Sequence, residues 1–88
     1  MKRNPDFLLR EVADTLVIVP VGKASVAFPG MITLNATSAF LWELLETEQT
    51  AQSLTQALTD RYAVDEVKAW EDVEGFIKKL VSIGAVEI

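Results

Sequence analysis

The side chains that could support chemistry in this chain are carboxylates, because the sequence contains neither histidine nor cysteine. Their absence removes the commonest general base, every thiol nucleophile and the commonest soft metal ligands. Glu71, Asp72 and Glu74 lie close together on a predicted helix, where their oxygens could hold a hard cation or serve acid–base catalysis. A solvated helix face accounts for the same residues. We therefore expect no enzymatic activity and no cofactor.

The elements that would position any site begin with strands. Residues 7–13 and 15–19 are rich in Leu, Val and Ile and are separated by Asp14, which predicts an antiparallel hairpin. Pro20 is expected to end the second strand, since proline cannot donate to the ladder. The stretch VGKASVAFPG at 21–30 predicts a loop or bulged arm. A short third strand is expected from Met31 to Leu34.

Three helices follow the strands. Asn35, Thr50 and Asp65 each precede an apolar helical pattern and carry a side-chain oxygen that can cap a helix. The first helix is expected to end near residue 46, and the third to cover about 66–83. Gly84 then stands where a helix end favours a residue that can take positive φ. Residues 85–88 are expected to form a stub strand or to fray.

Segregated strands and helices predict an α+β fold, winged helix-turn-helix-like, with a three-stranded antiparallel sheet followed by three helices. The 88 residues suit one domain spanning 1–88. Net charge is −5, so we expect no nucleic-acid partner, because backbone binding relies on clustered Lys and Arg. No apolar segment has the length of a membrane span or signal peptide. We expect no membrane association and a cytoplasmic location.

The third helix carries an unusually wide apolar arc. At about 100° per residue, its apolar side chains cover about half of the helix circumference, more than one small sheet needs. Either neighbouring elements wrap the helix on two sides, or one edge of the arc is left for a partner. Trp42 is expected in the core, whereas Trp70 lies on this arc and stays ambiguous.

The ordered set of motifs carries a family resemblance. The stretch LNATSAFLWELL at 34–45, then Tyr62 and Val64, and finally the pattern that ends in GAVE at 84–87 together resemble the PqqD-like family. The resemblance covers essentially the whole chain, in the same order of elements. Members of that family are recognition elements of ribosomally made peptide natural products.

The resemblance implies a non-catalytic adaptor that binds the leader of a precursor peptide and presents it to a modifying enzyme. A radical SAM enzyme or a leader peptidase is the partner enzyme implied. In the family the leader adds as a strand beside the third strand and lies against the third helix. The peptide-binding residues expected on this basis are Gly30, Met31, Ile32, Thr33 and Leu34 on the strand, and Val67, Trp70, Val73, Ile77 and Leu80 on the helix.

Strand addition explains why the third strand is so short, because an exposed sheet edge serves as a template rather than as core. About four backbone hydrogen bonds at ~0.5–1.5 kcal/mol each fall short of the ~8 kcal/mol of micromolar binding. Apolar leader side chains must therefore be buried as well. Two alternatives stay open: a winged-helix nucleic-acid binder, and an interaction module whose open edge pairs with a second copy.

Overall fold

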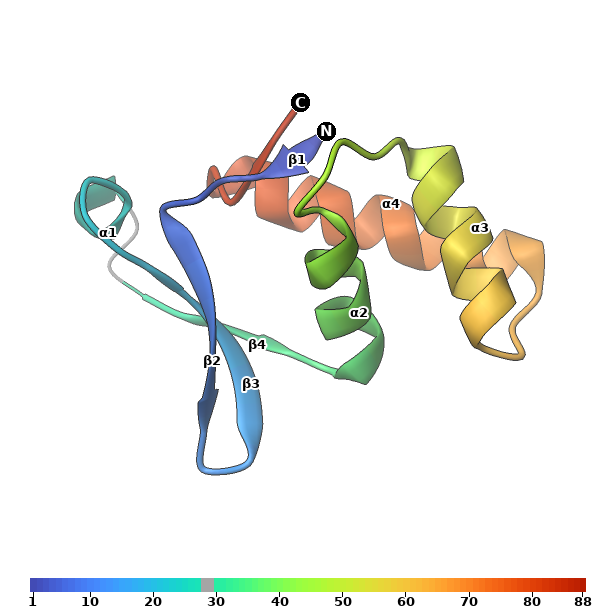
Figure 1. The fold of residues 1–88 in the computed structure, drawn as a ribbon, viewed down its shortest axis with the longest axis horizontal. Helices are drawn as coiled ribbons and strands as arrows, with labels where there is room; N and C mark the ends of the chain where they lie inside the picture. Colours follow the sequence, from blue (N-terminus) through green and yellow to red (C-terminus); the bar gives the residue numbers. More distant parts are fainter. Residues whose placement is uncertain (28–29) are drawn as a thin grey trace.

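The computed structural model describes residues 1–27 and 30–88 (Figure 1). A small sheet and a group of helices are joined through one core. The strands are β1 (Lys2–Arg3), β2 (Phe7–Val12), β3 (Thr15–Pro20), β4 (Ile32–Leu34) and β5 (Val86–Glu87); the helices are α1 (Ala24–Ala27), α2 (Ala36–Leu44), α3 (Ala51–Arg61) and α4 (Glu66–Ser82). The α+β class and the three-stranded antiparallel sheet followed by helices are confirmed.

The three-stranded sheet has the order β2-β3-β4, with both pairs antiparallel. The β2–β3 hairpin turns at two residues with positive φ, Ala13 at 51° and Asp14 at 67°, as a type I′ turn requires. This turn matches the twist of the flanking strands and fixes the register, which pairs Val12 with Thr15 and Phe7 with Pro20. Pro20 is the last residue of β3, as its missing N–H predicts.

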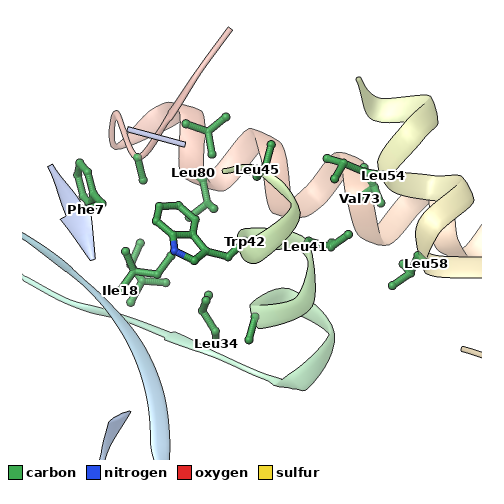
Figure 2. Packing of buried hydrophobic residues seen from close by; sticks show 14 of the residues in the cluster. Phe7, Ile18, Leu34, Leu41, Trp42, Leu45, Leu54, Leu58, Val73 and Leu80 are labelled. Atoms are coloured by element: carbon green, nitrogen blue, oxygen red, sulfur yellow. The ribbon is translucent and has the colours of Figure 1, made fainter. Parts of the chain in front are cut away.

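The core lies between one face of the sheet and the helices (Figure 2). Trp42 is 1% exposed, and its ring lies between Ile18 of β3 and Leu80 of α4. The prediction that Trp42 belongs to the core is confirmed. Alternation along the strands places Leu9, Ile18 and Ile32 on this covered face. Helices α2 and α4 pack against this face of the sheet.

All three predicted helix caps are confirmed. The side chains of Asn35, Thr50 and Asp65 accept hydrogen bonds from backbone N–H groups three residues further on, over 2.8, 3.0 and 2.8 Å. Ser53 reciprocates to the Thr50 N–H at 2.9 Å, which completes a capping box. Gly84 follows α4 with φ +81°, as a helix end of this kind favours.

Two local expectations need correction, and one strand was not predicted. The arm at 21–30 contains a single helical turn, α1, closed by bonds such as Ala24 N to Val21 O at 3.2 Å; Phe28 and Pro29 lie outside the described residues. Helix α2 ends at residue 44 rather than 46, because the backbone tightens into i→i+3 bonds. The two-residue strand β1 was not predicted, since it forms only by pairing with β5 at the far end of the chain.

None of the helices in the described ranges 1–27 and 30–88 combines the length and the apolar character needed to cross a membrane.

Candidate functional site

Strand β4 lies at one edge of the sheet, and its free side can be assigned from the hydrogen-bond pattern. Val21 N donates to Asp6 O over 2.7 Å, so these two residues form a hydrogen-bonded pair just beyond Phe7 and Pro20. Such pairs alternate along an antiparallel ladder. Arg10–Val17 is therefore a hydrogen-bonded pair of β2 and β3, as is the Val12–Thr15 pair that closes the turn.

The same alternation fixes the orientation of β4. Leu16 and Ile18 direct their backbone groups away from β2 and toward their partners Leu34 and Ile32. Thr33, between those partners, directs its N–H and C=O to the free side. Within the described residues, Thr33 takes part in no backbone hydrogen bond outside the ladder. β4 thus offers an open template for an extended chain.

The five predicted strand residues divide into two groups. Ile32 and Leu34 are 7% and 6% exposed and belong to the core. Met31 is 57% exposed, and Gly30 and Thr33 are also exposed. A bound peptide can therefore reach the side chains of Met31 and Thr33, while Ile32 and Leu34 hold the edge in place from the core side.

The five predicted helix residues divide as well. Val73 and Leu80 of α4 are 0% and 1% exposed and pack within the hydrophobic cluster. They support the helix from inside and are closed to a ligand. Val67 and Trp70 are 69% and 41% exposed, and Ile77 is half-buried. Only these last three of the five present apolar surface.

Trp70 and Ile77 lie on the flank of α4 that is shared with α3, and Val67 lines a small hollow with Trp70. Trp70 lines a hollow with α3 residues that include Thr55 and Thr59. Ile77 lines a second hollow with Ala51, at the start of α3, and with the C-terminal Ile88. In Figure 1 the start of α3 and the C-terminal segment lie above α4, whereas β4 and the start of α2 lie below it. Trp70 and Ile77 therefore lie on the side of α4 away from β4.

The opposite flank of α4 is the one on the β4 side. At about 100° per residue, this flank lies across the buried stripe of Ala69, Val73 and Leu80 from Ile77. Phe76 is half-buried there against the core cluster. The sequence could reveal the wide arc but not which of its edges adjoins the sheet. The side chains of this β4-side flank are Lys68, Asp72, Phe76, Lys79 and Ile83.

One ion pair marks the β4-side flank. Lys68 Nζ donates to Asp72 Oδ1 over 3.0 Å. This hydrogen bond, together with the charge of Asp72, raises the pKa of Lys68 above its ordinary value. Asp72 is thereby engaged with a lysine. Among the described residues, no three of the residue types Asp, Glu, His and Cys gather closely enough to hold a metal ion.

The other sheet edge, on β2, is partly covered. By the alternation above, Phe7, Leu9 and Glu11 direct their backbone groups outward from β2. Phe7 N donates to Asn4 O over 3.0 Å, and the Arg10 guanidinium donates to Leu9 O over 3.2 Å. The two edges of one sheet therefore differ in how much of their backbone is available.

Comparison with known proteins was made against families, curated proteins and solved structures. The family model described as coenzyme PQQ synthesis protein D (PqqD) matches residues 15–86. No curated protein matches the chain.

Two solved structures share the fold. One is TbiB1 in complex with the TbiA(beta) leader peptide, with TM-score 0.77 and 21% identity over 99% of this chain and 95% of that one. The other is lasso peptide synthetase B1 complexed with the leader peptide, with TM-score 0.72 and 20% identity over 94% of this chain and 92% of that one.

Proposed function

This chain belongs to the PqqD family, and from that premise we propose that it captures the leader of a ribosomally made precursor peptide. The leader adds as a strand to β4 and buries apolar side chains against α4. The open edge of β4 is the observation that carries the proposal. Two structures with this fold are complexes with leader peptides, which supports the same role.

Thr33 is the central backbone contact in this proposal. Its N–H and C=O form one hydrogen-bonded pair with a leader residue, and Met31, two residues earlier, forms the next pair. These four bonds contribute a few kcal/mol at ~0.5–1.5 kcal/mol each. They set the register and direction of the leader, while side-chain burial supplies the rest of the affinity.

The burial surface that we propose is the β4-side flank of α4. Phe76 offers apolar area beside the core, and Lys79 is exposed on the same flank. A leader with an apolar anchor and a carboxylate nearby would match this pair of side chains. Val67, Trp70 and Ile77 remain outside the proposed groove, because Trp70 and Ile77 lie on the flank shared with α3 and Val67 adjoins Trp70.

We further propose that residues 1–88 act as a non-catalytic adaptor domain in the cytoplasm, and that the captured leader is delivered to a separate modifying enzyme. A radical SAM enzyme and a leader peptidase both fit this role, because each must find a precursor whose reactive part varies. Binding the leader away from the core peptide separates recognition from chemistry. The adaptor then needs no catalytic group of its own.

An amide-resolved NMR titration tests the proposal. The probe is the leader half of a short peptide encoded beside the gene for this chain. Shifts at residues 30–34 and at Asp72, Phe76 and Lys79 are expected. A scrambled leader of the same composition is the control and should leave these amides unchanged. Shifts that spare β4, or that appear equally with the scrambled peptide, would contradict the proposal.

The nucleic-acid alternative has no supporting observation in the described structure. Arg61, the basic residue at the end of α3, lies over the rings of Phe40 and Tyr62, at 5.5 and 6.0 Å from their centroids. Self-pairing through β4 remains a competing use of the same edge. Light scattering across a concentration series separates it, because a self-pairing edge gives a dimer that the leader dissociates.

A further inference from the structure

Another hollow, of about 550 Å³, lies along the β2 edge of the sheet. Its walls come from β1, β2, β5 and the buried ring of Trp42, which brings together residues from both ends of the chain. Three of its lining residues are basic, Lys2, Arg3 and Arg10. They gather here in a chain whose net charge is −5.

These three cations have no ion-pair partner among the described residues, where the ion pairs are those of the N-terminal amine with Glu48 and of Lys68 with Asp72. Two carboxylates, Glu46 and Glu87, also line the hollow, yet neither approaches a basic group within ion-pair distance. With three cations against two carboxylates, the hollow retains an excess of one positive charge.

Arg3 is the most constrained of the three. Its side chain is half-buried, its guanidinium lies 5.7 Å from the centroid of the Trp42 ring, and Nη1 donates to Trp42 O over 3.3 Å. A guanidinium has five N–H donors. Since this fork is held in place by the ring and one carbonyl, its other donors are preorganised for a planar acceptor such as a carboxylate.

Arg10 links the charge to the strand edge. Its guanidinium donates to Leu9 O over 3.2 Å, and Leu9 directs its backbone outward from β2. A neutral strand would have to displace this guanidinium without offering it a new acceptor. A strand that carries a carboxylate offers that acceptor, and so releases Leu9 O for backbone pairing.

We infer that this hollow binds an extended peptide segment with carboxylate side chains, supplied by a protein partner. One carboxylate meets Arg3 over Trp42, a second meets Arg10, and Leu9 pairs with the peptide backbone. Apolar side chains between the acids contact the exposed Pro5 and the half-buried Leu9, which line the same hollow. A polyanion such as nucleic acid suits the site less, because the whole chain repels it.

This site lies on the edge opposite β4, so the inference does not rest on leader binding. Both edges can be occupied at once, which would let the chain hold an acidic segment of one partner on β2 while β4 holds another peptide. Failure of either site leaves the other untouched, and the two are tested with different peptides.

Fluorescence of Trp42 provides the test. Trp70→Phe leaves Trp42 as the one tryptophan, because the chain has two. The probe is the acetylated, amidated pentapeptide Glu-Val-Glu-Val-Glu, and its control is Gln-Val-Gln-Val-Gln. We expect a saturable change with the first that is lost with the second, and that weakens as salt is raised.

Charge variants locate the binding. Arg10→Gln, at an exposed residue, should lower the affinity for the acidic peptide at least tenfold. Lys23→Gln is an equal charge change outside the hollow and should bind the peptide as the parent protein does. Arg3→Gln should lower the affinity further, and a thermal melt checks that this variant is folded. Equal binding of the two peptides, an unaffected Arg10→Gln variant, or a stronger response to a single-stranded oligonucleotide would overturn the inference.

Discussion

The two edges of the β2-β3-β4 sheet carry the same kinds of outward backbone groups but differ in how many of them are hydrogen-bonded. On β2, Asn4 and Arg10 occupy the outward N–H of Phe7 and the outward C=O of Leu9. On β4, the groups of Thr33 have no such partner within the described residues. Exposed edges invite unwanted pairing, and proteins normally cover them. The free backbone groups of Thr33 support the proposal that a partner strand adds at β4.

A similar contrast holds between the flanks of α4. The flank that carries Trp70 and Ile77 is shared with α3, and the flank that carries Phe76 lies on the side of β4. Each flank carries apolar side chains, so helical periodicity alone does not show which flank adjoins the sheet. Their neighbours decide which one can join the open edge in a single binding surface.

The largest effect is expected for Ile32→Pro. The N–H of Ile32 points to Ile18, and its side chain is 7% exposed, so the substitution breaks the ladder and opens the core. We expect the free energy of unfolding to fall by ~3–5 kcal/mol, measured by urea denaturation. A loss below ~1 kcal/mol would show that the assigned direction of β4 is wrong.

Thr33→Pro should act on binding instead of stability. The N–H that it removes faces the free side, where proline is tolerated, so the urea midpoint should change little. Leader affinity should fall at least tenfold, measured by calorimetry. Glu11→Pro is the matched control, because it removes an outward N–H from β2; it should leave leader affinity unchanged. Equal losses in both variants would erase the distinction between the edges.

Phe76→Ala and Ile77→Ala compare the two flanks of α4 at adjacent half-buried residues. Phe76→Ala should lower the affinity for the leader about five- to tenfold, since it removes apolar surface from the proposed groove. Ile77→Ala should change affinity less than about twofold. Each affinity is read with a thermal melt, which separates lost contact from lost folding. The reverse ranking would place the leader on the flank shared with α3.

The smallest effect is expected for Ala13→Gly in the hairpin turn. Ala13 has φ 51°, a left-handed conformation that costs non-glycine residues ~1–2 kcal/mol. Glycine relieves that strain but loses more chain entropy on folding, so we expect a net gain of up to ~1 kcal/mol in urea denaturation. Leader affinity should stay the same, because the turn lies at the far end of the β2–β3 hairpin. A loss of stability would contradict the assigned turn type.

Local sequence patterns predicted much of the fold. The caps at Asn35, Thr50 and Asp65 were predictable because each bond closes within three residues. The hairpin and the third strand followed from β-branched runs and turn residues. Strand β1 was not predicted, because two residues are too few to show a strand pattern. It forms by pairing Lys2 with Glu87 at the other end of the chain.

The candidate site was only partly predictable. The short strand at 31–34 was predicted as the sheet edge. The direction of the Thr33 backbone groups could not be predicted, because it depends on the register between β3 and β4. On α4, the periodicity predicted the apolar arc but not which elements pack against it. The sequence therefore could not distinguish Val73 and Leu80, which are core residues, from Trp70, which lies at the surface. Phe76 was not predicted as a binding residue, because only the position of β4 shows which flank of α4 adjoins the sheet.

Amide hydrogen exchange with and without the leader tests the central claim most directly. The difference between the two sheet edges predicts that the leader slows exchange at Met31 and Thr33 at least tenfold and leaves Leu9 and Glu11 unchanged. Protection at Leu9 and Glu11 with none at Thr33 would show that the leader uses the β2 edge, and would contradict the account.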